Sequence, residues 1–236
     1  MKLAIMQPYF FPYIGYWQLI HAVDRFVIYD DVNFIKGGWI NRNRILINGK
    51  PCYITAPLHQ SSSYKHICDI SLQPSFLWRD KLVKMVETTY RKAPFFSEVF
   101  PTIEKLIRYE ADNLSDYLSY QLQTLARFMF INTKFVLSSH LYQNNGLTGQ
   151  DRVLDICKRE NATTYINPQG GQSLYSQDAF AHCDVNLKFL LPLTVNYKQF
   201  GVKSESRLSI IDVLIFNGID GTRKLLDEYS IVTSCK

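Results

Sequence analysis

Three side chains suited to acid–base chemistry follow apolar runs of the sequence. Asp30 and Asp31 end the run RFVIYDD, and His140 follows the run KFVLSS. Carboxylates at the end of a strand can act as a general base or bind Mg²⁺, and histidine changes its charge near neutral pH. An equally weighted structural interpretation has the two aspartates capping a loop or pairing with Arg42 or Arg44. We take Asp31 and His140 as catalytic candidates and Asp30 as a binding candidate.

A stiff aromatic loop, QPYFFPYIGY, lies between the apolar run KLAIM and a helical pattern at about residues 13–23. Two prolines fix its backbone, and a glycine lets the following helix approach another group closely. Free N–H groups at the helix start suit a phosphate. The polar side chains are therefore site candidates: Tyr13 for catalysis, and Gln7, Tyr9, Gly15 and Tyr16 for binding. The large apolar rings are predicted to be core: Phe10, Phe11 and Trp17.

Two further loops contain glycine pairs. NFIKGGWINRNR follows the acidic pair and offers a lysine beside free backbone N–H groups, which suits an anion. NPQGGQSLY follows the strand-like run TTYI and can wrap a phosphate or sugar, although plain turn chemistry explains it equally well. The binding candidates in these loops are Asn33, Lys36, Trp39, Asn41, Arg42, Arg44, Gly170, Gly171, Ser173 and Tyr175. No metal site is predicted, because the sequence lacks HExxH and C-x-x-C motifs.

These loops require a sheet that brings strand ends together. Residues 2–31 have the pattern strand, helix, strand, which is a βαβ unit of a parallel sheet. Asn48 and Gly49 between two β-rich runs predict a hairpin. Residues 75–131 have helical periodicity, and we interpret them as an inserted helical lid within a single domain spanning residues 1–236. The predicted fold class is therefore α/β: a mostly parallel, Rossmann-like (nucleotidyltransferase-like) sheet with an added β-hairpin and a helical insert.

Several residues mark the expected ends of elements. Asn113, Thr148 and Ser209 are predicted N-caps, because their side chains can accept hydrogen bonds from the first free N–H groups of a helix. Gly218 suits the left-handed position after a helix and predicts the end of the last one. A further strand is expected over residues 134–141.

Composition limits the classes of function. The chain has 236 residues and a net charge of +5 without a dense Lys/Arg patch, which argues against nucleic acid and suits a small anionic ligand. Five scattered cysteines give no disulfide framework, and no apolar run is long enough for a signal peptide or a membrane span. A cytoplasmic protein is expected, and a homodimer is left open.

The opening loop has a look-alike among enzymes that bind nucleotides. The string Tyr13-Ile14-Gly15-Tyr16 occupies the place of H-x-G-H in nucleotidyltransferases and pantothenate-synthetase-like ligases, with tyrosine for both histidines. The similarity implies a shared fold and nucleotide binding. Because tyrosine carries no charge at neutral pH, it does not support adenylyl transfer by the histidine mechanism.

Three stretches together resemble the WbqC-like protein family: AIMQPYFFPYIGYWQLI with FVIYDDVNFIKGGWINRNRI, TTYINPQGGQSLY, and LSIIDVLIFNG. The match covers residues 3–58 closely and residues 148–220 again. Members of this family are encoded among bacterial O-antigen and surface-polysaccharide genes, which implies work on an activated sugar.

The resemblance and the loops together suggest an acyl or aminoacyl transferase, or a ligase-like enzyme, that forms an amide on a nucleotide-linked amino sugar. In this interpretation Lys36 and Arg42 bind phosphates, tyrosines stack on the base or sugar, and Asp31 or His140 takes the amine proton. The donor is left open between a nucleotide such as ATP and acyl-CoA. Two alternatives remain: a non-catalytic nucleotide-sugar or glycan-binding module, and a metal-dependent glycosyltransferase that uses Asp30 and Asp31.

Overall fold

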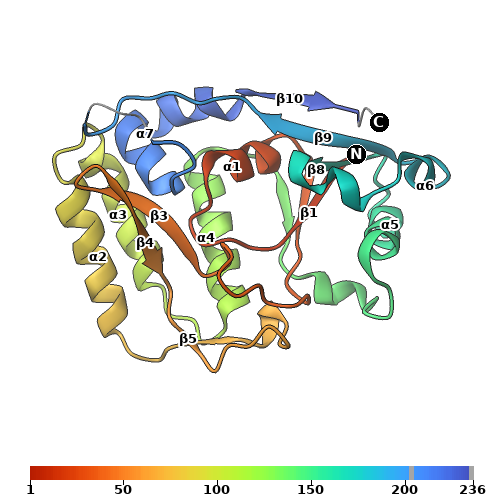
Figure 1. Ribbon diagram of the computed structural model, residues 1–236, viewed down its shortest axis with the longest axis horizontal. Helices are drawn as coiled ribbons and strands as arrows, with labels where there is room; N and C mark the ends of the chain where they lie inside the picture. Colours follow the sequence, from red (N-terminus) through yellow and green to blue (C-terminus); the bar gives the residue numbers. More distant parts are fainter. Residues whose placement is uncertain (202–204, 234–236) are drawn as a thin grey trace.

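A mostly parallel sheet forms the centre of the molecule. The computed structural model describes residues 1–201 and 205–233, and its main sheet has six strands in the order β10-β9-β8-β1-β2-β7 (Figure 1). The strands are β1 (Lys2–Met6), β2 (Arg25–Ile28), β7 (Lys134–Val136), β8 (Thr164–Pro168), β9 (Asn186–Pro192) and β10 (Tyr229–Val232). Neighbouring strands are parallel except β10, which runs antiparallel to β9. The predicted α/β class with a mostly parallel sheet is confirmed.

Helices cover both faces of this sheet. They are α1 (Ile14–His21), α2 (Leu77–Tyr90), α3 (Phe96–Arg108), α4 (Leu114–Phe128), α5 (Gly149–Arg159), α6 (Gln177–Ala181) and α7 (Ile210–Leu226). Ala4, Phe26 and Ile28 face the cluster containing α1, α4 and α7, whereas Leu3 and Val27 face α5 and α6 (Figure 1). Because both faces are buried, a ligand reaches this sheet at its strand ends. None of the described helices is both long enough and apolar enough to cross a membrane.

The predicted hairpin is confirmed. Its strands are β3 (Arg42–Ile47) and β4 (Lys50–Thr55), which pair in a two-stranded sheet of their own. Asn48 and Gly49 both have positive φ, 49° and 73°, as a tight two-residue turn of this type requires. Two short strands, β5 (Leu58–His59) and β6 (Ser71–Leu72), form a second small sheet.

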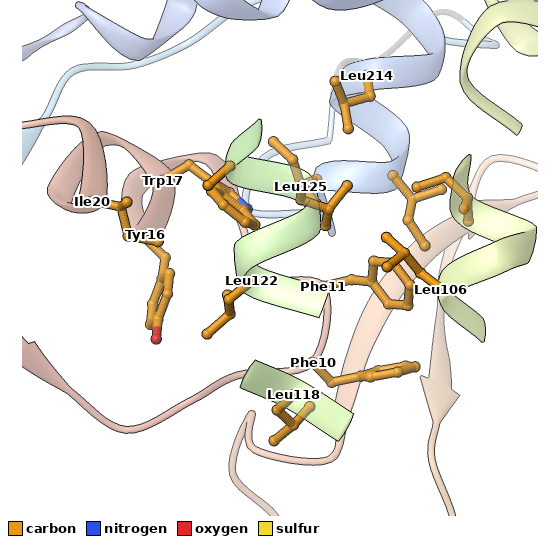
Figure 2. Close-up of a cluster of buried hydrophobic side chains, with 14 of the residues drawn as sticks. Phe10, Phe11, Tyr16, Trp17, Ile20, Leu106, Leu118, Leu122, Leu125 and Leu214 are labelled. Carbon is orange, nitrogen blue, oxygen red and sulfur yellow. The ribbon is translucent and has the colours of Figure 1, made fainter. Parts of the chain in front are cut away.

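The opening aromatic loop is the centre of the larger core. Phe10, Phe11 and Trp17 are completely buried, as predicted, and Figure 2 shows their rings among leucines of α3, α4 and α7. The loop backbone is held from two sides. Asn43 of β3 donates its amide to the carbonyls of Phe10 and Phe11 at 3.1 and 2.8 Å, and the Ser209 hydroxyl donates to the Phe11 carbonyl at 2.9 Å. These bonds hold Phe11 at a φ of 41°, which is unfavourable for a bulky residue.

Helix ends agree with the sequence in part. The Asn113 side chain accepts hydrogen bonds from the backbone of Ser115 and Asp116, and the Ser209 side chain caps α7. Thr148 occupies the N-cap position of α5, but its side chain accepts no cap hydrogen bond.

The helix end expected at Gly218 is confirmed in part, and one other predicted boundary is wrong. Gly218 has a non-helical backbone with a φ of 65° and interrupts α7, but a second helical part continues beyond this kink to Leu226; the Phe95 ring occupies the space of a Cβ at Gly218. The strand expected over residues 134–141 ends at Val136, because Ser139–Tyr142 turns into a 3₁₀ helix capped by the Ser138 hydroxyl.

Replacing Asn43 should destabilise the fold. In Asn43→Leu the Phe10 carbonyl loses its amide donor, at a cost of about 1–3 kcal/mol for a buried carbonyl left unpaired, whereas the Phe11 carbonyl keeps the Ser209 hydroxyl. Urea unfolding should therefore show a lower free energy of unfolding. Exposed Asn132 gives a control, Asn132→Leu, with stability close to wild type. Equal stability of the two variants would contradict this role of Asn43.

Candidate functional site

The candidate site lies where the sheet changes its winding direction. From β1 the chain passes through α1 to β2 on one side, and it later returns through α5 to β8 on the other side of β1. In open α/β sheets, ligands bind beyond the carboxyl ends of the strands at such a point. The loops that follow β1, β2, β7 and β8 share this edge because these strands are parallel. They contain most of the residues selected from the sequence.

The tyrosines of the opening loop lie together at this edge. The rings of Tyr9 and Tyr16 are 5.3 Å apart, and the Tyr16 hydroxyl donates to the Gln7 carbonyl at 2.8 Å. Tyr16 is buried, whereas Tyr9 and Tyr13 are half-buried. Burial raises the pKa of each of the three phenols. They are therefore neutral hydrogen-bonding groups, and only Tyr9 and Tyr13 retain exposed surface for a ligand.

Local packing explains why residue 15 is a glycine. A Cβ at this position would lie 2.5 Å from a ring carbon of Tyr13 and 3.0 Å from Pro192. Glycine therefore lets the Tyr13 ring lie over the first turn of α1. Tyr13 is the N-cap residue of α1, and it forms an isolated β-bridge with Ser209.

Arg207 is a nearby cation that the sequence did not identify. It lies two residues before Ser209, which bridges to Tyr13, and its positive charge partly opposes the burial that raises the pKa of Tyr13. Arg207 is exposed and has a φ of 56°. Two phenols and one exposed guanidinium together can bind an anion that also carries hydroxyl groups.

The two aspartates at the end of β2 are buried in hydrogen bonds. Asp30 accepts from the hydroxyls of Ser115 and Ser138 at 2.5 and 2.8 Å, and from the backbone N–H of Ser139 at 3.0 Å. Each aspartate is 2% exposed. This network ties the end of β2 to α4 and to the turn after β7.

Asp31 forms a buried ion pair. Its carboxylate lies 2.5 Å from the Arg152 guanidinium and also accepts a hydrogen bond from Ser139. The structural interpretation that paired the aspartates with Arg42 or Arg44 is wrong in its partners. Arg152 lies on α5, more than a hundred residues along the chain, and no local motif indicated it.

His140 is exposed on the 3₁₀ helix that contains Ser139. Its backbone N–H donates to the Ser138 hydroxyl at 3.2 Å, while its imidazole faces solvent. Ser138 and Ser139 both contact Asp30. The aspartates therefore fix the position of the turn from which His140 projects.

The Gly-Gly loop and the hairpin form an outer aromatic and arginine surface. Arg42 donates to the carbonyls of Gly37 and Gly38 and lies 4.5 Å from the Tyr53 ring centre. Arg44 lies 5.7 Å from the Trp39 ring. Arg42 and Arg44 share one face of β3, opposite Asn43, as strand alternation requires. Lys36 and Asn33 are exposed, and the amide of Asn41 donates to the Ala56 carbonyl.

In the loop after β8, packing requires glycine at position 171 but not at position 170. A Cβ on Gly171 would lie 2.2 Å from the side-chain oxygen of Asn167, whereas Gly170 has open space. The Asn167 amide donates to the Tyr165 hydroxyl at 2.7 Å, and that hydroxyl lies 3.4 Å from the one of Tyr175. Ser173 and Gly170 are exposed. This segment thus contributes a buried amide and phenol network beneath the 3₁₀ helix Gln169–Leu174.

Comparison with known proteins gives the family of the chain. The model of the WbqC-like protein family matches residues 7–224. The chain belongs to the WbqC-like family. It is 28% identical over 218 residues to an uncharacterized protein of Mycobacterium tuberculosis, Rv1507c, and this alignment covers 92% of the chain and 93% of Rv1507c. No solved structure matches the chain.

This WbqC-like chain also buries an acidic group outside the predicted site. Asp212 of α7 has no exposed surface and accepts hydrogen bonds from the hydroxyls of Tyr90 and Tyr197 at 2.6 and 2.7 Å, and from the Gln199 amide at 3.0 Å. Burial raises the pKa of its carboxyl, although the three donors act in the opposite direction. No sequence motif singled out this position.

The stability of this WbqC-like protein should depend on Asp212 and pH. Because the pKa of Asp212 is raised on folding, the folded state holds the proton more tightly, and stability falls as pH rises from about 4 through the raised pKa. Asp212→Asn cannot titrate. The difference in unfolding free energy, wild type minus variant, should therefore decrease with rising pH across this window. A difference that increases with pH would contradict the raised pKa.

Breaking the Arg152–Asp31 pair should be costly. Arg152→Met leaves a buried carboxylate without its cation, and we expect a loss of about 3–5 kcal/mol in the free energy of unfolding. Asp31→Asn combined with Arg152→Met should recover part of this loss, because the unpaired charge is gone. Exposed Arg91, as Arg91→Met, is the matched control. Urea unfolding of wild type, Arg152→Met, Asp31→Asn and the double variant measures the coupling, and additive losses would contradict a buried ion pair.

Proposed function

We propose that this chain is an enzyme of bacterial surface-polysaccharide (O-antigen) biosynthesis that forms an amide on a nucleotide-linked amino sugar by acyl or aminoacyl transfer. The observation that carries the proposal is the position of Tyr9 and Tyr13 in the loop after β1, at the edge between β1 and β8, with Arg207 two residues before the Ser209 that bridges to Tyr13. A neutral, partly aromatic surface beside one cation suits a sugar with a phosphate. We further propose a Rossmann-like, nucleotidyltransferase-like relationship for the sheet, with residues 75–131 as a lid within one domain.

The residues divide into binding and chemical roles in this proposal. The opening loop, Arg207 and Lys36 bind phosphates, and the half-buried tyrosines contact the sugar or base. In the reaction the amine nitrogen attacks the carbonyl of the acyl donor, a C–N bond forms, and the bond to the leaving group breaks. The leaving group is the thiolate of an acyl-CoA or the nucleotide of an ATP-activated acyl group, and a base takes the amine proton.

His140 is the better candidate for that base. Asp31 was the alternative, but it is 2% exposed and paired with Arg152, so a substrate amine has no access to its oxygens. His140 is exposed and projects from the turn that Asp30 positions. We therefore assign Asp30 and Asp31 to positioning and His140 to proton transfer.

The structure also bears on the two alternative functions. A glycosyltransferase that binds its metal through Asp30 and Asp31 is disfavoured, because serine and arginine groups already occupy their carboxylate oxygens. A nucleotide-sugar or glycan-binding module without catalysis needs no base and is supported by the tyrosines that replace the H-x-G-H histidines. Turnover distinguishes this module from an enzyme.

Ligand binding should raise the melting temperature. We expect UDP- or dTDP-linked amino sugars to stabilise the wild-type protein, because a ligand that binds only the folded state shifts the unfolding equilibrium. Tyr13→Phe removes a hydroxyl from the site and should reduce the shift. Tyr64→Phe, at a tyrosine that is 92% exposed, should leave the shift unchanged. No shift with any nucleotide sugar would overturn the nucleotide-sugar proposal.

Catalysis is tested with the same sugars. Wild-type protein with an acyl-CoA, or with ATP and a carboxylic or amino acid, should yield the amide by mass spectrometry. His140→Gln should lower the rate about 10²–10⁴-fold, the usual contribution of a general base, while the thermal shift persists. Binding without product in the wild type would favour the non-catalytic module. Full activity in His140→Gln would remove this residue from the chemistry.

A further inference from the structure

Three potential metal ligands meet next to the end of β2. They are His66, Cys68 and Asp69, and one ligand atom from each lies within 4.8 Å of the others. The His66 Nδ1 is 3.7 Å from an Asp69 oxygen, and the Cys68 Sγ is 4.0 Å from the other Asp69 oxygen. A tetrahedral zinc ion with bonds of about 2.0–2.3 Å places its ligand atoms roughly 3.3–3.8 Å apart. The two short distances involve different Asp69 oxygens, so the side chains must move slightly closer together for one oxygen to share an ion with both partners.

The backbone of this segment is fixed from both sides. Residues 66–68 run beside the end of β2: His66 forms a β-bridge with Asn33, and the Cys68 N–H donates to the Asp30 carbonyl at 3.0 Å. The side chain of Asn113, the N-cap of α4, donates to the Cys68 carbonyl. Ligands held on a fixed backbone lose little conformational freedom when an ion binds.

The local charge favours a cation. The donors to the Asp30 carboxylate are neutral: three hydroxyls and one backbone N–H. The Asp30 side chain is an acidic group on the residue whose carbonyl accepts from the Cys68 N–H, and Asp69 adds a second carboxylate in the cluster itself. A divalent ion would neutralise this local excess of negative charge.

We propose that His66, Cys68 and Asp69 bind a zinc ion, with water as the fourth ligand. Nitrogen, sulfur and oxygen donors in a set of three are typical of zinc sites that keep an open position. The side chains of His66 and Asp69 are 40% and 64% exposed, so solvent can reach the ion. This site does not depend on the amide-forming function. The water would lie at the same sheet edge as the candidate site, where zinc could lower the pKa of that water to about 7.

The chain contains a matched comparison for this cluster. His182, Cys183 and Asp184 have the same three residue types in succession after α6, and all three are exposed. Among the residues that the structure describes, only His66, Cys68 and Asp69 form a group with three ligand atoms in reach of one ion. The proposal therefore rests on arrangement and not on the presence of histidine, cysteine and aspartate.

Metal binding tests the proposal directly. Metal-free full-length protein should bind one Zn²⁺ in competition with a chromophoric chelator, and Co²⁺ in its place should give a thiolate-to-cobalt absorption band. Cys68→Ser should abolish the band and weaken zinc binding by more than the roughly 10–100-fold that loss of a second-shell partner costs. Cys183→Ser should keep both the band and the affinity.

A second variant distinguishes loss of a zinc ligand from loss of the fold. The Asp69 side chain is largely exposed, so Asp69→Asn should fold normally, as checked by circular dichroism, and should still weaken zinc binding. Absence of stoichiometric zinc binding in the wild type would overturn the proposal. So would a cobalt band that survives Cys68→Ser and disappears in Cys183→Ser. Neither result depends on an assay of catalysis.

Discussion

The buried amide of Asn43 is the interaction on which the arrangement of the site depends. Through it the hairpin holds the carbonyls of Phe10 and Phe11, and Ser209 at the start of α7 holds the Phe11 carbonyl from the other side. The loop can therefore bury its phenylalanine rings while its half-buried tyrosines stay at the sheet edge. Without these donors the positive φ of Phe11 would have no compensation. Core packing and site geometry are consequently set by the same three segments.

A second buried network organises the other half of the edge. Asp30 and Asp31 look like catalytic carboxylates in the sequence, yet their oxygens bond to three serines and Arg152. The Asp30 carboxylate holds the turn that contains His140. The Asp30 backbone carbonyl accepts a hydrogen bond from the N–H of Cys68. These buried aspartates thus position groups that lie nearer the surface.

Local signals in the sequence predicted local structure. The hairpin was predicted from Asn48-Gly49, and the start of α4 was predicted from Asn113 as its N-cap. Both predictions succeeded because turns and caps depend on a few adjacent residues. The partner of the buried Asp31 could not be predicted this way, because Arg152 lies far from it in the sequence and only the fold brings the two together. Gly218 breaks the helix with a positive φ, as its residue type predicted, but the second helical part beyond it was not predicted.

Hydrogen–deuterium exchange with and without a UDP-linked amino sugar would locate the ligand on the intact protein most directly. Binding at the edge between β1 and β8 should slow exchange in peptides covering residues 7–16 and 167–175. A pocket of about 330 Å³ between α6 and β9, lined by residues such as Gln177 and Lys188, offers a different location. Slowed exchange confined to residues 177–188, with residues 7–16 unchanged, would contradict a ligand site built on the opening loop.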